Sequence, residues 1–435
     1  MAGLNKYKAY PEYKDSGVEW LGEIPKHWAV CRLKNLATIK NGQDYKSVQA
    51  ECGYPVIGSG GQFMFASKYM YDKPSVLLGR KGTIDKPLYI NEPFWTVDTM
   101  YYTELNDDVD AKYFYYLALT IQFSRYSTNT ALPSMTQEHL SNYKFAAPKV
   151  ESDRKQITDF LDHETAKIDN LIEKQQQLIN LLKEKRQAVI SHAVTKGLNP
   201  DVPMKDSGVE WLGEVPKHWV VSGFKKYLAS IVDYRGKTPN KIDDGILLVT
   251  ARNIKKGMLD YTLSEEFIAS SDYKEVMSRG VPNIGDVLFT TEAPLGEVAN
   301  VDRTDIALAQ RIIKFNGMAS FLDNYYFKYF IMSSAFQQSL NLYSSGSTAQ
   351  GIKAERFVYL RKLLPPMKEQ RQIVNFLDKE TCKIDVLVEK QFSMLSLLQE
   401  RRTALISAAV TGKIDVRNWV APDTQEVEVS QEAAA

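Results

Sequence analysis

Two stretches of the chain carry apolar residues at the spacing of an amphipathic helix. From Ile168 and from Ile384, apolar side chains recur at steps of three, four and seven residues, with Lys, Glu and Gln between them. These positions are Ile168, Leu171, Ile172, Leu178, Ile179, Leu182 and Val189 in one stretch and Ile384, Leu387, Val388, Met394, Leu395, Leu398 and Leu405 in the other. Neither Pro nor Gly interrupts the pattern before Gly197 and Gly412. The pattern predicts two long helices, each ended by a glycine.

Each apolar stripe is long and narrow, which is typical of a coiled-coil seam. If the two halves of the chain are related by a pseudo-two-fold axis, the helices run antiparallel and bury their stripes on each other. An ordinary pair of core helices is the alternative. A helix rises about 1.5 Å per residue, so about 25–40 residues span roughly 40–60 Å. This length would hold two domains about one turn of B-DNA apart.

The helical stretches belong to an internal sequence repeat. Residues 14–30 and 205–221 are nearly identical, and residues 154–197 and 370–413 align without a gap. Two of the seventeen positions in the short blocks differ, and both changes are small and apolar: Ile24/Val215 and Ala29/Val220. The order along the chain is therefore short block, variable region and helical block, followed by the same three again.

The variable regions, about 31–150 and 222–367, share little sequence with each other. Short apolar runs separated by Gly, Asn and Asp clusters predict strands, and two longer runs predict helices. The predicted strands are 54–57, 75–78, 87–90, 246–250, 286–290 and 306–315, and the predicted helices are 111–123 and 322–340. We therefore expect a mixed α/β (α+β) fold, with two globular domains separated by two long antiparallel coiled-coil helices.

The repeat also predicts domain boundaries. A first conserved block and first globular domain occupy 1–150, and a repeated block with the second domain occupies 205–367. Between and after them we expect a central helix at 151–204, a C-terminal helix at 368–413 and a flexible tail at 414–435. Two nearly identical frames that hold dissimilar inserts suit a protein that docks one kind of partner twice and recognises two different targets.

Composition narrows the class of protein. The net charge is +1, so the chain as a whole is not a polycation, although both variable regions are mildly basic, with 13 Lys+Arg against 11 Asp+Glu in 29–150 and 18 against 15 in 220–366. The three cysteines are far apart and form no C-x-x-C pair, so we expect no disulfide framework, no zinc site and a cytoplasmic setting. We expect no signal peptide and no membrane span.

Polar loops of the variable regions are the candidates for DNA contact. Segment 79–82 combines two cations with glycines that allow close backbone approach, and segment 235–238 has the same character. Residues 252–256 place a guanine reader, an adenine reader and two phosphate binders together. The candidates are Ser59, Arg80, Lys81, Arg235, Lys237, Arg252, Asn253, Lys255, Ser347 and Thr348. For each one, a plain solvated loop residue is the alternative.

No motif indicates catalysis. Gly236-Lys237-Thr238 lacks the preceding glycine of a phosphate-binding loop, because Ile stands at 231 and Pro follows at 239. The Asn-Pro-Pro-aromatic tetrapeptide of amino-methyltransferases is absent. Asp162-His163-Glu164 becomes Asp378-Lys379-Glu380 in the second copy, which favours helix-start acids over a metal site. We therefore assign no catalytic residue and no metal ligand.

Several repeated phrases resemble those of one known family. The frame KDSGVEWLGE-(I/V)-PKHW, the Pro, Glu, Arg and Gln residues before each helix, and the phrase FLD-x-ET-x-KID are similar to specificity (S, or HsdS) subunits of type I restriction–modification enzymes. Segment 233–239 also resembles the start of a target-recognition domain in that family. The resemblance runs from about residue 14 to residue 413.

The resemblance implies a non-catalytic subunit that binds double-stranded DNA. Each variable region would be a target-recognition domain, and together they would read an asymmetric bipartite site with an unspecified gap, set by the helices. Two methyltransferase (M) subunits would bring S-adenosylmethionine, and two motor-nuclease (R) subunits would bring ATP and Mg²⁺, with no cofactor on this chain. The alternatives are a scaffold that does not read DNA and an enzyme with two catalytic lobes.

Overall fold

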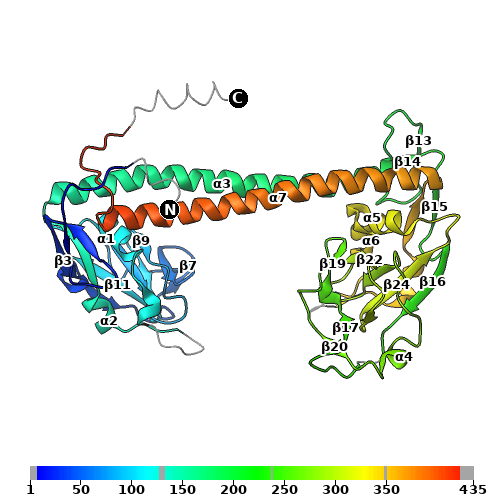
Figure 1. The fold of residues 1–435 in the computed structure, drawn as a ribbon, viewed down its shortest axis with the longest axis horizontal. Coiled ribbons are helices and arrows are strands. Elements are labelled where there is room, and N and C mark those ends of the chain that lie inside the picture. Colours follow the sequence, from blue (N-terminus) through cyan, green and yellow to red (C-terminus); the bar gives the residue numbers. More distant parts are fainter. Residues whose placement is uncertain (1–6, 127–132, 237–238, 347–349, 422–435) are drawn as a thin grey trace. The chain divides into compact units, whose positions relative to one another are not determined.

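The computed structural model describes residues 7–126, 133–236, 239–346 and 350–421. The chain divides into two compact units: unit 1 comprises Met1–Gln176 and Ser393–Ala435, and unit 2 comprises Gln177–Phe392. Helices α3 (Glu151–Lys196) and α7 (Met367–Val410) pass through both, so each unit holds a segment of each helix and one globular region (Figure 1).

The two long helices confirm the prediction from the apolar periodicity. A glycine with positive φ follows each helix, Gly197 (82°) directly after α3 and Gly412 (74°) two residues after the end of α7. Residues with a Cβ rarely adopt this backbone conformation. Glu151 and Asp153 lie in the first turn of α3, where the unpaired N–H groups of the helix favour negative charge. Within the described residues, none of the helices combines the length and apolarity that a bilayer span requires.

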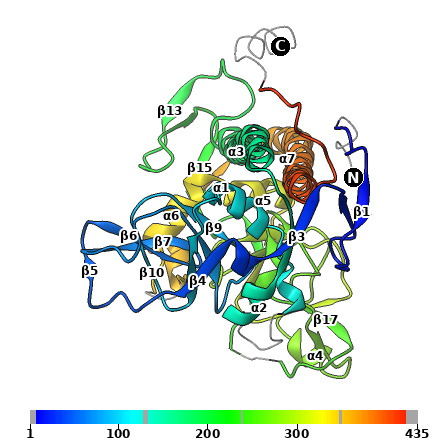
Figure 2. The same cartoon turned by 90° about the vertical axis from the view of Figure 1, so that its left-hand side faces the viewer.

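In each unit the α3 and α7 segments lie side by side and run antiparallel (Figures 1 and 2). In unit 2, Arg186 of α3 pairs with Asp385 of α7, and Lys183, one turn earlier on α3, lies over the ring of Phe392 later on α7. In unit 1, Arg402 pairs with Asp169. Apolar side chains are buried in these segments, among them Ile168, Leu398 and Leu405 in unit 1 and Ile179 and Ile190 in unit 2.

The globular part of unit 1 is built on two sheets, ordered β4-β11-β8-β9 and β10-β6-β7-β5. A short ladder of β12 with β3 leads into α3. The strands are β3 (Trp28–Arg32), β4 (Ala37–Asn41), β5 (Gln49–Ala50), β6 (Tyr54–Gly58), β7 (Gly61–Ala66), β8 (Ser75–Gly79), β9 (Leu88–Ile90), β10 (Trp95–Thr96), β11 (Met100–Leu105) and β12 (Lys144–Pro148), with helices α1 (Ala111–Ala118) and α2 (Gln137–Asn142). Trp28, Tyr113 and Phe114 share one core with Leu405 of α7.

Unit 2 repeats this plan, but its second sheet has three strands where that of unit 1 has four. Its sheets are ordered β16-β24-β21-β22 and β20-β17-β23, and β15 pairs with β25 before α7. The elements are β15 (Val220–Gly223), β16 (Leu228–Asp233), β17 (Ile246–Val249), β20 (Phe267–Ile268), β21 (Val287–Thr290), β22 (Val298–Asn300), β23 (Ile306–Leu308), β24 (Ile312–Gly317), β25 (Arg361–Leu364), α4 (Tyr273–Val276), α5 (Asn324–Met332) and α6 (Ser334–Tyr343). Phe224, Phe315 and Phe327 form an aromatic centre of the core.

Three predicted elements are divided in the structure. The predicted strand 306–315 is β23 and β24 in different sheets, because Arg311 turns the chain with a φ of 79°. The predicted helix 322–340 is α5 and α6, because Ser333 is extended and its hydroxyl caps α6. The predicted helix 111–123 ends at Ala118 and is followed by a 3-10 turn, Phe123–Arg125.

The short sequence blocks fold alike in both units. In unit 1, β1 (Tyr13–Asp15) pairs with β2 (Glu23–Pro25), and in unit 2, β13 (Met204–Asp206) pairs with β14 (Glu214–Pro216). The Nζ atom of Lys14 donates to the Trp28 carbonyl at 2.6 Å, and that of Lys205 donates to the Trp219 carbonyl at 2.8 Å.

The two blocks differ in one contact to the helix that follows. Glu369 accepts from Trp219 Nε1 at 2.9 Å and lies 2.8 Å from His218 Nε2. Its counterpart in unit 1 is Asp153, which is one methylene shorter and lies 3.8 Å from His27 Nε2. Trp28 Nε1 is buried without a partner among the described residues.

The prediction of a flexible tail at 414–435 is wrong for its first part. Ile414 and Val416 are buried in the core of unit 1, and the backbone N–H of Asp415 donates to the Lys8 carbonyl at 2.7 Å. The Trp419 ring packs edge-on against Phe160 with centroids 5.4 Å apart. Residues 422–435 lie outside the described residues.

Candidate nucleic-acid interface

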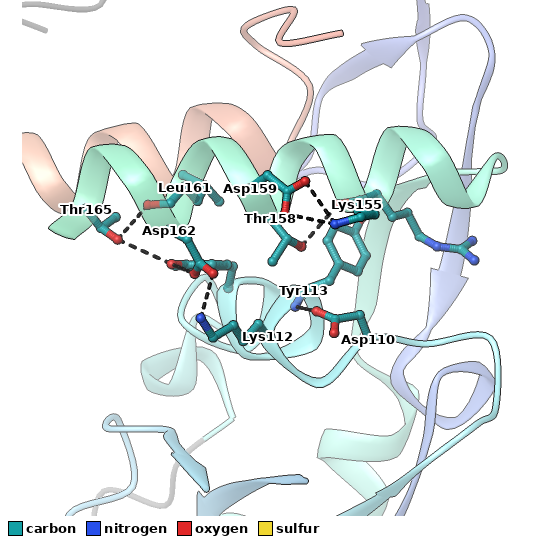
Figure 3. Close-up of polar contacts among 11 residues, drawn as sticks. Asp110, Lys112, Tyr113, Lys155, Thr158, Asp159, Leu161, Asp162 and Thr165 are labelled. Carbon is teal, nitrogen blue, oxygen red and sulfur yellow. Dashed lines mark hydrogen bonds and ion pairs between the residues drawn. The ribbon is translucent and has the colours of Figure 1, made fainter. Parts of the chain in front are cut away.

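A hydrogen-bonded latch fixes the globular part of unit 1 to α3 (Figure 3). The Tyr116 hydroxyl, on α1, donates to Asp162 Oδ1 at 2.7 Å and lies 3.3 Å from Thr165 Oγ1. Lys112, one turn earlier on α1, donates to the other carboxylate oxygen of Asp162 at 2.6 Å. The Asp110 side chain caps α1 by accepting from the backbone N–H of Tyr113 at 2.8 Å. Both oxygens of Asp162 are thereby occupied by α1.

Unit 2 carries the tyrosine–aspartate contact of this latch on α7, with Tyr325 at the position that corresponds to Lys112. The Tyr329 hydroxyl, on α5, donates to Asp378 Oδ1 at 2.6 Å and lies 3.5 Å from Thr381 Oγ1. The two contacting helices share the pattern Asp-x-x-Tyr-Phe-x-Tyr, at 110–116 and 323–329. Sequence analysis missed this pattern, although the common spacing of Asp, Tyr, Phe and Tyr was its visible signal.

Burial keeps the latch tyrosines protonated. It raises the pKa of Tyr116, and the hydrogen bond to Asp162 raises it further. Burial and the Asp378 hydrogen bond do the same to the pKa of Tyr329. Both phenols therefore keep their proton at neutral pH and can donate to the aspartates. Each globular region is thus anchored at the equivalent place on its own long helix.

In unit 1, three backbone segments meet where β8 ends. The backbone N–H groups of Arg80 and Lys81 donate to the Thr99 carbonyl at 2.9 and 3.1 Å. The N–H of Met135 donates back to the Arg80 carbonyl at 3.0 Å, and Lys81 pairs with Ser134 as an isolated antiparallel bridge. We call this arrangement the loop junction of unit 1. A Cβ at Gly79 would lie 2.5 Å from the Ile84 Cα, so the close approach of the loop requires glycine.

The corresponding loop junction of unit 2 lies where β21 ends. The N–H of Thr291 donates to the Arg311 carbonyl at 2.8 Å, and the N–H of Ile352 donates to the Thr291 carbonyl at 3.0 Å. Glu292 pairs with Gly351 as an isolated antiparallel bridge, and its carboxylate lies 2.8 Å from Arg311 Nε.

A cleft of about 240 Å³ adjoins this junction. It is lined by residues of β17 and of the segment just before β20, two strands that lie on the side of unit 2 away from α3 and α7 (Figure 1). Its polar lining comprises Lys241, Thr250, Arg252, Glu266, Gln310 and Arg311. Glu266 holds Lys241 and Arg252, each at 2.6 Å, and these contacts lower the pKa of Glu266 although burial alone would raise it.

Three of the ten predicted contact residues have side chains with no hydrogen bond or ion pair to another described residue. The side chains of Lys81 and Lys255 are exposed, and Lys255 interacts electrostatically with Asp260. Ser59 is half-buried in the turn between β6 and β7. These three stay predictions.

The three predicted arginines are engaged within the protein. Arg80 donates to the Asp98 carbonyl at 3.1 Å and lies over the Tyr101 ring. Arg252 pairs with Glu266 but is largely exposed. Arg235 is held more firmly: its Nε lies 2.9 and 3.0 Å from the two Asp233 oxygens, and its Nη1 donates to the Ile352 carbonyl at 3.3 Å. Although burial opposes it, this contact keeps the pKa of Asp233 below its usual range.

The structure corrects the expectation for Asn253. Its side chain is fully buried, and its Nδ2 donates to the carbonyls of Asp260 and Ser264 at 3.0 and 2.8 Å. Its Oδ1 accepts from the Thr250 N–H at 2.8 Å. Because both ends of the amide are satisfied inside the fold, Asn253 is a structural residue and not an adenine reader. Lys237, Ser347 and Thr348 lie outside the described residues.

The described residues contain no group of three His, Cys, Asp or Glu side chains suited to holding a metal ion. Cys31 is partly buried, and Cys52 and Cys382 are exposed. What the two units do offer is a pair of polar, partly basic loop junctions on separately anchored domains, an arrangement suited to binding nucleic acid.

Comparison with known proteins assigns this architecture to a family. The sequence model of one protein family, the type I restriction modification DNA specificity domain, matches residues 25–183 and 228–390. Each match takes in one globular region and the adjoining part of a long helix. The chain therefore belongs to the family of type I restriction–modification DNA specificity subunits, and it carries two copies of the specificity domain. This match confirms the family resemblance identified in the sequence. It also confirms that the chain is a specificity subunit and not a catalytic subunit.

Individual relatives agree with this assignment. The chain is 24% identical over 357 residues to the type I restriction enzyme MjaVIII specificity subunit of Methanocaldococcus jannaschii, covering 79% of this chain and 77% of that protein. It is 20% identical over 453 residues to the EcoBI specificity subunit of Escherichia coli, covering 98% and 94%. A solved chain from a type I R-M system, described in terms of complex assembly and conformational transition, has a similar fold with a TM-score of 0.65 at 14% identity, covering 90% and 99%.

Proposed function

We propose that this chain recognises an asymmetric, bipartite DNA site, with unit 1 reading one part and unit 2 the other. The observation that carries the proposal is the repeated latch. Tyr116 on Asp162 and Tyr329 on Asp378 attach two domains of different sequence to equivalent positions of the two helical repeats. Because the two domains are anchored in the same way but differ in sequence, each would read a half-site of its own.

The long helices act in this proposal as an antiparallel coiled coil that sets the unread gap. The ion pair in each unit supports this, because Arg186 and Arg402 are equivalent in the sequence repeat, and so are Asp385 and Asp169. A pseudo-two-fold relation between the repeats produces such a pattern. If each domain covers about 3–5 base pairs and the half-sites are centred one helical turn apart, the gap is roughly 5–8 base pairs.

The helices also carry the proposed docking surface for the methyltransferase subunits. Unit 1 exposes Leu171, Met394 and Leu397, and unit 2 exposes the repeat-equivalent Leu387, Leu178 and Leu181, each between 39% and 61% exposed. Exposed apolar side chains at the same positions in both units suit one kind of partner that binds twice. Unit 1 and unit 2 would thus each receive one M subunit.

The catalytic steps belong in this proposal to partners. Two M subunits bring S-adenosylmethionine and methylate adenine, and two R subunits bring ATP and Mg²⁺ for translocation and cleavage. The partners also share the neutralisation of phosphates, which reconciles DNA binding with a net charge of +1. The complex works in the cytoplasm, where its double-stranded DNA substrate lies.

Single-molecule methylation sequencing tests the proposal. Genomic DNA is compared between hosts with and without this gene, with the M partner present in both. A methyl-adenine mark at a gapped two-part motif that disappears with the gene is expected. Absence of any gene-dependent mark, with an active and soluble M partner, would favour a scaffold that does not read DNA. Exchange of residues 31–150 for another member's region then separates the two, because only a recognition subunit would change one half-site and keep the other.

A further inference from the structure

The two loop junctions have the same hydrogen-bond frame, although their sequences differ. Arg80 N–H to Thr99 O in unit 1 corresponds to Thr291 N–H to Arg311 O in unit 2. Met135 N–H to Arg80 O corresponds to Ile352 N–H to Thr291 O. The bridges Lys81–Ser134 and Glu292–Gly351 also correspond. The frame therefore pairs position 80 with 291, 81 with 292 and 99 with 311.

The cation stands on a different segment of this common frame in each unit. In unit 1 the cations stand on the first segment, as Arg80 and Lys81, and Thr99 stands opposite. In unit 2 the first segment carries Thr291 and Glu292, and the cation stands opposite as Arg311, preceded by Gln310. Each junction thus offers a cation at its surface, but from a different segment.

We infer that Arg311 and Gln310 are base-reading residues of unit 2, and that Glu292 holds Arg311 in place until DNA replaces it. This inference rests on the proposed function. Arg311 and Gln310 both line the cleft beside β17 and β20. Arginine makes two hydrogen bonds to the major-groove edge of guanine, and glutamine makes two to that of adenine. The pair is therefore suited to reading purines of the second half-site.

The ion pair of Arg311 suits such an exchange. Its Nε lies 2.8 Å from Glu292 Oε1, and the two side chains are 48% and 45% exposed. An exposed pair of this kind is held weakly, so a base edge can displace the carboxylate at little cost. Arg235, with its contacts to Asp233 and to a backbone carbonyl, is not free in the same way. The carboxylate of Glu292 also repels phosphates, which disfavours non-sequence-specific binding.

Substitution of Arg311 tests the inference in the complex with its M partner. Methylation sequencing is carried out with the unchanged chain, with Arg311→Ala, with Arg311→Lys and with a control, Arg303→Ala. Arg303 pairs with Asp305 on the surface of the same unit and does not line the cleft. We expect Arg311→Ala to lose about 10- to 100-fold of the preference for guanine at one position of one half-site, the discrimination of one bidentate pair. The other half-site and the gap should stay unchanged.

The remaining variants complete the test. Arg311→Lys keeps the charge but loses the two-pronged geometry, so its base preference should fall as well, whereas Arg303→Ala should read the original motif. Gln310→Ala should relax an adenine position of the same half-site. Glu292→Gln should keep the motif and bind non-specific duplex several-fold more tightly.

The outcomes separate the inference from the function on which it rests. If the unchanged chain directs no gapped motif, the proposed function fails. If it directs one and Arg311→Ala reads the same bases with the same preference, Arg311 is not a reader and the inference is overturned. An Arg311→Ala protein with an unchanged melting temperature excludes loss of folding as the cause of a relaxed motif. An unchanged non-specific affinity of Glu292→Gln would remove Glu292 from its assigned role.

Discussion

Arg186 of α3 and Asp385 of α7 form a two-pronged ion pair in unit 2, with Nε–Oδ1 and Nη2–Oδ2 distances of 2.8 and 3.1 Å. Arg402 and Asp169 form its repeat-equivalent in unit 1, at 2.7 and 3.1 Å. Each helix therefore contributes the arginine in one unit and the aspartate in the other, at positions that are equivalent in the sequence.

Removing one arginine should weaken the pairing of the helix segments in its own unit. Arg186→Ala is expected to lower the free energy of unfolding by about 0.5–1 kcal/mol, because the pair is partly exposed but has good two-pronged geometry. The double variant Arg186→Asp with Asp385→Arg should recover part of this loss. Urea unfolding measures both. The single variants Arg186→Asp and Asp385→Arg are measured as well. If the double variant loses as much stability as these two lose together, the pair contributes nothing beyond its separate charges.

The latch should contribute more than the surface ion pairs. Tyr116→Phe keeps the ring and removes the hydroxyl that donates to Asp162, so we expect a loss of about 1.5–3 kcal/mol, as for hydrogen bonds to charged groups. Tyr329→Phe should have a similar effect in unit 2. Tyr115→Phe is the control, because the Tyr115 hydroxyl has no hydrogen bond among the described residues. Equal melting temperatures of Tyr116→Phe and the control would contradict the latch.

A longer acid at position 153 should stabilise unit 1. Glu369 reaches Trp219 Nε1 in unit 2, whereas Asp153 leaves Trp28 Nε1 buried and unpaired. Asp153→Glu should therefore raise the free energy of unfolding by about 1 kcal/mol. The mirror substitution Glu369→Asp should lower it by a similar amount. Thermal unfolding of Asp153→Glu and of Glu369→Asp measures both changes. If both substitutions raise stability, or both lower it, the longer acid is not the cause.

Lys362 should give the protein a distinctive pH dependence. The side chain is fully buried, and burial lowers its pKa to about 7, whereas an unfolded chain has a lysine pKa near 10.4. Between these values the unfolded state binds more protons, so Lys362 makes stability rise with pH from about 7 to 10 and contributes no slope below 7. The slope reaches at most about 1.4 kcal/mol per pH unit.

Substitution isolates this contribution. Lys362→Met should remove the slope between pH 7 and 9, whatever its effect on absolute stability, whereas the exposed control Lys225→Met should keep it. Chemical unfolding at several pH values gives the comparison. If Lys362→Met retains the slope of the unchanged chain, Lys362 is protonated in the folded protein at pH 9.

The helices should determine the length of the gap in the target. Four residues inserted within α3 lengthen it by about 6 Å, close to two base pairs of B-DNA. Methylation sequencing is expected to show a wider gap and unchanged half-sites. A matched four-residue insertion in the loop 198–203, beyond the end of α3, should leave the gap unaltered. An unchanged gap in the helix variant would show that the length of the helices does not set the gap.

Sequence patterns alone were enough to predict the long helices and most of the strands. The apolar periodicity from Ile168 and Ile384 depends on local spacing, which survives into the fold. The division of 306–315 was not predictable in this way, because the apolar run continues through a turn that Arg311 makes with a positive φ. Its apolar residues are buried on both sides of that turn.

The recognition surface was harder to predict, for a different reason. Asn253 and Lys255 are two residues apart, yet one is buried by contacts with Asp260 and Ser264 and the other is exposed. Residue type alone does not distinguish a base reader from a residue that ties a loop together. The sequence does not single out Arg311, because the segments that surround it come together only in the fold, through backbone hydrogen bonds between distant parts of the chain.

The loop junctions have a consequence for how such proteins diversify. Their frame is held by main-chain groups at Arg80, Thr99 and Met135 in one unit and at Thr291, Arg311 and Ile352 in the other. The side chains on this frame differ between the two units, whereas the hydrogen bonds are the same. If the junctions read bases as proposed, a substitution on this frame would change the target without a matching loss of foldability, so a new target could arise one side chain at a time.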